Sequence, residues 1–216
     1  MNAQRLRALA SMALFFALPA GSALAGPILV NNADFETLPP GVVLPPTGFT
    51  EFIGIPGWNA SGDTGQWDPD FPTFNNANGT TTIGYSNGPT ISQTVAPAVQ
   101  AGDTYTLTVD IGYRTDEPFD GGADLLVNGN QYLATGITPT PGNWSVFTAT
   151  YTGIASDAGD PITIELTSTG AQGDFDYVTL SDSGPGLTTT PEPSGVLLFG
   201  TGLAGLGGLI RRRLRA

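Results

Sequence analysis

The amino-acid sequence predicts an all-β protein built as an antiparallel β-sandwich. Apolar and polar residues alternate with a period of two in several segments, as they do in strands that bury one face. Between positions 26 and 193, no segment of a dozen residues carries the apolar stripe of an amphipathic helix. The chain has 30 Gly and 18 Pro in 216 residues, which suits short strands joined by many turns.

The N-terminal segment has the features of a signal peptide. Two arginines precede the apolar run from Leu9 to Leu18, and the small residues Ala23 and Ala25 suit a signal peptidase. We therefore expect residues 1–25 to be removed by that enzyme. The short apolar run argues against an uncleaved anchor.

The segment 26–182 is predicted to be the β-sandwich domain, and its clearest strand covers residues 105–113. The odd positions of that strand are apolar and the even positions are polar or Gly. Residues 162–167 alternate in the same way. Residues 125–133 predict a hairpin, because Asn-Gly at 128–129 is a preferred two-residue turn. Weaker strands are expected near 28–31, 50–53, 81–85, 90–95, 145–152 and 175–181.

The C-terminal part is predicted to be a flexible linker, 183–190, followed by a sorting tail, 191–216. The tail combines an apolar stretch at 194–210 with a basic end. At about 1.5 Å per residue, such a stretch reaches roughly 25 Å as a helix, which is near the shortest transmembrane length. Because arginines stay on the cytoplasmic side, the upstream domain should lie outside. The residues that define the tail are Pro191, Glu192, Pro193, Arg211, Arg212 and Arg213.

This tail resembles the PEP-CTERM sorting signal of Gram-negative bacteria. The resemblance implies that an exosortase-type membrane protease cuts near the Pro-Glu-Pro triplet at 191–193. The upstream domain would then pass from the inner membrane to the outer envelope or the extracellular matrix. A permanent membrane anchor is the alternative.

Charge and composition exclude several classes of function. Residues 26–193 contain a single cation, Arg114, and all 19 acidic residues, a formal net charge of −18. This charge argues against binding to nucleic acid and favours cations as partners. The absence of Cys and His excludes disulfides, thiolate zinc sites and imidazole-based triads. Paired carboxylates can hydrolyse glycosides, but no pair is singled out by its surroundings. We expect no enzymatic activity.

The domain resembles the galactose-binding-like jelly roll of many carbohydrate-binding modules. The resemblance rests on four segments of the sequence: Val30 to Glu36, Pro56-Gly57-Trp58, Gly102 to Asp110 and Asp174 to Leu180. It implies a structural Ca²⁺ ion between the first and last strands.

The implied calcium ligands are Glu36 and Asp176, with backbone carbonyls near Asp34. Hard cations take six to eight oxygen ligands, which suits a chain rich in carboxylates. Asp176 shares its alternation with Val178 and Leu180, so it is expected to point inward. The alternative is that Asp176 caps backbone amides or faces solvent at the rim.

A glycan site needs an aromatic ring with polar groups beside it. Trp67 is the first candidate because it lies in an acidic segment, 63–70, that reads as an exposed loop. Trp58 and Trp144 read as packing residues. The alternative is that the loop is merely solvated or binds a second cation. Weaker candidate contacts are Asp68, Asp70, Tyr113 and Arg114.

These observations predict an exported cell-envelope or extracellular-matrix protein with a structural role in an exopolysaccharide or biofilm matrix. The alternative is a carbohydrate-binding module that recognises a specific glycan. The expected partners are the signal peptidase, the exosortase-type protease and a polysaccharide.

Overall fold

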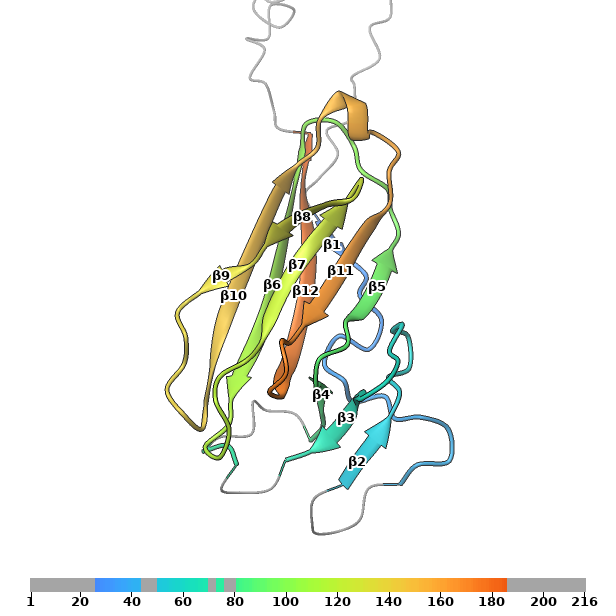
Figure 1. The fold of residues 1–216 in the computed structure, drawn as a ribbon. Helices are drawn as coiled ribbons and strands as arrows, with labels where there is room; N and C mark the ends of the chain where they lie inside the picture. Colours follow the sequence, from blue (N-terminus) through green and yellow to red (C-terminus); the bar gives the residue numbers. More distant parts are fainter. Residues whose placement is uncertain (1–25, 44–49, 70–72, 76–80, 186–216) are drawn as a thin grey trace, which may run out of the picture.

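The strands form two antiparallel sheets that pack face to face (Figure 1). The structure is a computed structural model that describes residues 26–43, 50–69, 73–75 and 81–185. It confirms the predicted all-β antiparallel sandwich. The predicted signal peptide and sorting tail lie outside the described residues. Across the described part of the chain, no helix has the length and apolar character needed to cross a membrane.

The larger sheet has eight strands, in the order β2-β3-β4-β12-β6-β10-β9, and β1 also pairs with β12. In Figure 1, β2, β3 and β4 lie together at one end of the molecule. The strands of this sheet are β1 (Gly26–Ile28), β2 (Thr50–Ile53), β3 (Thr64–Asp68), β4 (Ile83–Ser86), β6 (Asp103–Tyr113), β9 (Thr135–Gly136), β10 (Asn143–Thr152) and β12 (Gly173–Pro185).

The smaller sheet has four strands in the order β5-β11-β7-β8. Its strands are β5 (Ile91–Val95), β11 (Ile162–Thr167), β7 (Gly122–Val127) and β8 (Asn130–Leu133). Between β10 and β11 lies a single 3-10 turn, Ala155–Asp157.

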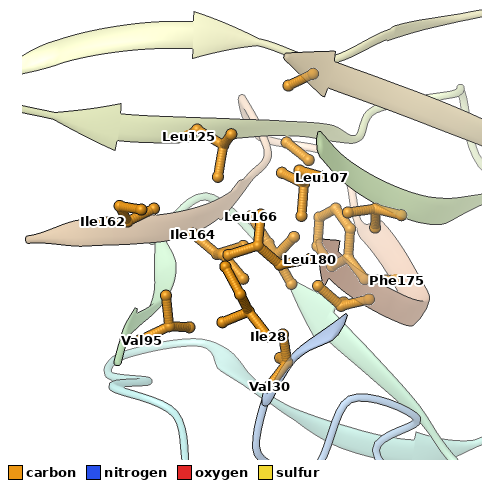
Figure 2. Close-up of a cluster of buried hydrophobic side chains, with 14 of the residues drawn as sticks. Ile28, Val30, Val95, Leu107, Leu125, Ile162, Ile164, Leu166, Phe175 and Leu180 are labelled. Carbon is orange, nitrogen blue, oxygen red and sulfur yellow. The ribbon is translucent and has the colours of Figure 1, made fainter. Parts of the chain in front are cut away.

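The hydrophobic core fills the space between the sheets. Leu107 on β6 and Leu180 on β12 face Leu125 on β7 and Ile164 on β11 (Figure 2). All four side chains are buried, as the two-residue alternation of their strands requires. Burial of apolar surface, at about 25 cal/mol per Å², is the main force that holds the sheets together.

Most predicted strands are confirmed to within a few residues. The hairpin is confirmed as β7 and β8, and Asn128 and Gly129 both have positive φ, as a two-residue hairpin turn requires. The segment expected to be an acidic loop is instead largely β3. Its alternation is hidden because both faces are covered: Gln66 packs inward and donates to the carbonyl oxygen of Phe35, and the next residue is buried on the opposite face. The short strand β9 was also not predicted.

Replacing Ile164 with Ala should destabilise the domain by about 2–5 kcal/mol, because the side chain is fully buried and its loss leaves a cavity. Ile137→Ala is the matched control, since that isoleucine is 84% exposed, and it should change stability by less than about 0.5 kcal/mol. Urea unfolding of both variants measures the difference. Equal losses would contradict the assignment of the core.

Candidate functional site

A second apolar cluster lies on the outer face of the larger sheet, away from the sandwich core. The pairing register places four residues in one row across β4, β12, β6 and β10: Tyr85, Asp174, Gly112 and Trp144. Trp67 on β3 belongs to the same cluster, together with Phe74 and Ile83. We call this group the aromatic cluster. Its members come from five strands and one loop, so the tertiary fold assembles it.

Gly112 makes room for the aromatic cluster in the middle of the sheet. A Cβ atom at this position would lie 2.8 Å from the Phe74 ring and 2.9 Å from the Trp144 ring. These rings stack on each other with centroids 4.7 Å apart, and the Phe74 and Trp67 centroids are 6.3 Å apart. The absent side chain therefore allows the rings to lie against the backbone of β6.

Trp67 is 0% exposed, so the expectation of an exposed ring at this position is wrong. Residues of the neighbouring strands and Phe74 cover it. Trp144 is half-buried at the edge of the cluster. It is the cluster's most exposed ring, although the sequence predicts a packing residue at this position. Trp58 does pack in the core, stacked on Phe35 with centroids 5.6 Å apart.

Two of the predicted contact residues meet in this cluster. The guanidinium carbon of Arg114 lies 5.0 Å from the centroid of the Trp67 ring, a cation–π contact. Arg114 also donates from Nε and Nη2 to the two carboxylate oxygens of Asp116, at 3.0 and 2.9 Å. Burial opposes the charge of Arg114, but this pairing and nearby carboxylates raise its pKa. The guanidinium therefore stays charged beside the rings.

A buried carboxyl group completes the site. Asp174 is 0% exposed, and its Oδ1 accepts hydrogen bonds from Trp67 Nε1 at 3.0 Å and from Gln172 Nε2 at 2.7 Å. The amide oxygen of Gln172, Oε1, accepts a hydrogen bond from Arg114 Nη1 at 2.7 Å. Gln172 therefore connects the guanidinium to the carboxyl group.

Burial raises the pKa of Asp174 to about 7, although the bonds from Gln172 and Trp67 and the charge of Arg114 act in the opposite direction. The Oδ2 atom has no hydrogen-bond partner among the described residues. Since Oδ1 accepts two N–H groups, a proton on this carboxyl group belongs on Oδ2. The site thus holds a carboxyl group that can donate or accept a proton near neutral pH.

Of the remaining predicted contact residues, Tyr113 lies apart from this network. Tyr113 is on the core side of β6, where its ring meets Phe119 edge-on with centroids 5.6 Å apart. Asp68 follows Trp67 on β3 and is half-buried. Asp70 lies outside the described residues.

Sequence reasoning missed Asp174 and Gln172 as site residues. Asp174 hydrogen-bonds a tryptophan that lies 107 positions away in the chain, and no local pattern encodes such a pairing. The available signal was the alternation of Asp174 and Asp176 around Phe175, which places two carboxyl groups on one face of a strand.

The predicted calcium ligand Asp176 is buried, as expected, but it does not point into the sandwich. A register shift between Asp176 and Thr179, with Tyr177 at a φ of 44°, reverses the alternation of β12. Asp176 therefore lies on the outer face beside Asp110, whereas Leu180 points into the core. The bulge could not be inferred from alternation alone.

The other predicted calcium ligands make hydrogen bonds of their own. Oε1 of Glu36 accepts from the backbone amides of Thr81 and Thr82, and Oδ1 of Asp34 accepts from the amide of Glu36. Among the described residues, no three carboxylates gather into a potential metal site. Calcium binding at these residues stays a prediction, and no function is derived from it.

No curated protein matches this chain. A cyclase from Fischerella sp. TAU, solved in complex with 4-(1H-indol-3-yl)butan-2-one, is similar in structure, with a TM-score of 0.57 and 19% sequence identity. The match covers 74% of this chain and 98% of the cyclase, and it shows a shared fold.

Two carbohydrate-binding modules give lower TM-scores. The CBM22-1 xylan-binding domain of Paenibacillus barcinonensis Xyn10C has a TM-score of 0.45 and 14% identity, over 74% of this chain and 96% of that domain. A CBM4 structure has a TM-score of 0.41 and 21% identity, over 71% of this chain and 99% of that one. Similarities of this size carry no argument about function.

The family model described as HpiC1 cyclase matches residues 26–181, which is most of the chain and nearly all of the described sandwich. The chain therefore belongs to the HpiC1-like family.

Proposed function

We propose that this chain is an exported protein of the cell envelope or extracellular matrix, and that its sandwich binds a glycan at the aromatic cluster without catalysis. The observation that carries the proposal is the half-buried Trp144 ring beside a network of polar groups on the outer face of the larger sheet. A pyranose face stacks on such a ring while its hydroxyl groups need directional partners. A binding role gives the matrix protein a specific contact with polysaccharide.

The polar part of the network suits a ligand rich in hydroxyl groups. Arg114 is held by Asp116 and Gln172, so its side chain, 13% exposed, has a fixed position. The carboxyl group of Asp174 is fully buried, so it positions Gln172 and Trp67 by hydrogen bonds and does not itself face the ligand. Preorganised donors and acceptors of this kind reduce the entropy lost on binding.

The export part of the proposal depends on the two ends of the chain. Six of its seven basic residues lie in the predicted signal peptide and sorting tail, and the segment between them is strongly acidic. This distribution follows the positive-inside rule for a domain that has crossed the membrane. A matrix location would bring the domain next to exopolysaccharide.

A second candidate function, acid catalysis on a small aromatic molecule, is favoured by one specific observation. The raised pKa of Asp174 provides a protonated carboxyl group near neutral pH, beside rings that stabilise positive charge. The family model is described as HpiC1 cyclase, and the structurally similar cyclase from Fischerella was solved in complex with an indole ketone. Asp174 would act as the general acid in such a reaction.

Replacing Trp144 with Ala should weaken glycan binding about tenfold or more, because a buried ring contact contributes about 1.5–3 kcal/mol. Trp144→Phe keeps a ring and should retain most of the affinity. Retention of the full chain in detergent on immobilised polysaccharides measures both. An unchanged affinity in the Ala variant would remove the glycan site from this cluster.

The same protein separates the two candidates when 4-(1H-indol-3-yl)butan-2-one is titrated against it. The second candidate would replace the first if the parent protein binds the indole ketone but retains no glycan, and if Asp174→Asn abolishes binding of the ketone. Glycan retention without binding of the indole ketone would support the first.

Asp174 should make stability fall as the pH rises. Its pKa rises from the ordinary aspartate value of 3.8 to about 7 in the fold, so the folded state binds more protons across that interval. This contribution is complete below pH 4 and is lost as the pH rises through 7. Asp174→Asn should therefore gain stability relative to the parent between pH 4 and pH 8.

Thermal unfolding at pH 4, 6 and 8 measures this difference. Burial also raises the pKa of Asp124, to about 6. Its contribution to the pH dependence of stability is the same in both proteins, so it cancels in the comparison. A constant difference between parent and variant over this range would show that Asp174 does not titrate there.

Changing Pro191, Glu192 and Pro193 to Ala together should keep the protein in the inner-membrane fraction, since a sorting protease would lose its recognition sequence. Cell fractionation and mass spectrometry of the C-terminus in the native host measure this. Changing Thr188, Thr189 and Thr190 to Ala is the control in the adjacent linker. Release of the Pro-Glu-Pro variant at the parental rate would contradict exosortase-type sorting.

A further inference from the structure

Rows of hydroxyl side chains cover the other half of the same outer face. The pairing register places Thr135, Thr148, Thr108 and Thr179 in one row across β9, β10, β6 and β12. The next row contains Thr150, Thr106 and Ser181, and the third contains Thr152 and Thr104. All of these side chains are exposed or half-buried. We call this surface the hydroxyl face.

The sheet gives these hydroxyl groups a regular spacing. Neighbouring strands lie about 4.8 Å apart, and alternate residues of one strand lie about 6.6 Å apart. Several hydroxyl groups bond to one another across strands: Thr108 to Thr179 at 2.6 Å and Thr104 to Thr152 at 2.9 Å. Since each hydroxyl group has one donor and two acceptor positions, these pairs keep capacity for further hydrogen bonds. Each threonine also presents a methyl group.

No charged residue pairs into the three rows of the hydroxyl face, although the segment has a net charge of −18 and the adjacent row contains Asp110 and Asp176. Selective absence of charge argues for a partner that is itself uncharged, because an acidic polymer would be repelled by the rest of the domain. Hydroxyl groups interleaved with methyl groups match the alternating hydroxyl and C–H surface of a sugar chain.

One row of the outer face, which contains Val146, Asp110 and Asp176, separates the hydroxyl face from the aromatic cluster. β10 runs from Trp144 to Thr152 and β6 from Thr104 to Gly112, side by side in antiparallel pairing (Figure 1). At about 3.3 Å per residue, the eight steps from Trp144 to Thr152 span roughly 26 Å. A ligand held at the Trp144 ring can therefore extend along the rows of threonines only if it is a chain.

We propose that the hydroxyl face binds a neutral polysaccharide chain that starts at the aromatic cluster, which deepens the glycan-binding proposal above and rests on it. The twist of the sheet decides the physical form of this partner. Neighbouring strands rotate by about 20–25°, so four strands turn through roughly 60–75°. A rigid flat lattice, such as ice or crystalline cellulose, would lose register over this distance, whereas a single flexible chain can follow the twist.

The test replaces two cross-strand partners, Thr106 and Thr150, with Val. Valine keeps the branched shape that suits a strand and replaces only the hydroxyl group, with a methyl group. The matched control is the Thr94→Val and Thr163→Val pair, because these partners hydrogen-bond across β5 and β11 of the smaller sheet at 2.8 Å. Circular dichroism and thermal unfolding establish that both variants fold.

Affinity is measured with the full chain in detergent against neutral polysaccharides and against short oligosaccharides of the same sugar. Two lost hydrogen bonds should weaken binding of the long chain by about tenfold or more. Binding of the short oligosaccharide should not change, since it reaches only the Trp144 ring. The control variant should bind both ligands like the parent.

Three outcomes would overturn the proposal. If Thr106→Val/Thr150→Val binds the long chain like the parent while Trp144→Ala loses affinity, the hydroxyl face is not part of the binding surface, although the glycan site at Trp144 is supported. Preference for an acidic polysaccharide, or adsorption to ice or crystalline cellulose in place of soluble chains, would show that the partner is wrong. Failure of the parent to bind any glycan would reject the function on which the proposal rests.

Discussion

The pairing of β6 with β12 is the constraint on which the rest of the structure depends. Both strands lie in the middle of the larger sheet, so neither has an edge exposed to solvent. The pleat gives each strand two faces with different roles. Leu107 and Phe175 face the smaller sheet and form the core, while Gly112 and Asp174 face outward and form the candidate site. A change in the register of this one pair would exchange the two faces.

The bulge in β12 lets one strand contribute to both halves of the outer face. Before the bulge, Asp174 and Asp176 are on this face, and after it Thr179 and Ser181 are. Without the extra residue, strict alternation would turn Leu180 outward and the threonine inward. The bulge therefore keeps the core apolar while the outer face changes from carboxyl groups to hydroxyl groups. The amide of Val178, next to the bulge, donates to the carbonyl oxygen of Ala33 at 2.9 Å, which ties the bulge to the first loop.

Local patterns predicted the parts of the fold that depend on neighbours in the sequence. The strands β6 and β11 follow a strict two-residue alternation because each has one buried face and one wetter face. The β7–β8 hairpin depends on the conformational freedom of Asn128 and Gly129 alone. The strand β3 could not be recognised, because Gln66 and Trp67 are both fully buried on opposite faces and the alternation disappears.

The candidate site was predictable only in part, for a related reason. Trp67 and Arg114 are both predicted contact residues, and they do meet, but their burial depends on strands that are distant in the sequence. Gln172 and Asp174 connect them: the Gln172 amide accepts from the guanidinium and donates to Asp174, which also accepts from Trp67 Nε1. Three strands and the loop segments beside them must first be assembled before these groups become neighbours. Long-range electrostatics of this kind leaves no periodic trace in a sequence.

The single cation between residues 26 and 193 has a role that explains its position. Arg114 lies beside Asp116, Glu117 and the buried Asp174, so it compensates the most unfavourable carboxyl group of the described chain. A lone buried carboxylate would be costly, and a second cation would remove the tendency of Asp174 to hold a proton. One guanidinium, connected through a neutral amide, stabilises the network and still leaves the pKa of Asp174 near 7. The pKa of Asp174 therefore depends on its burial and on the single guanidinium of this acidic domain.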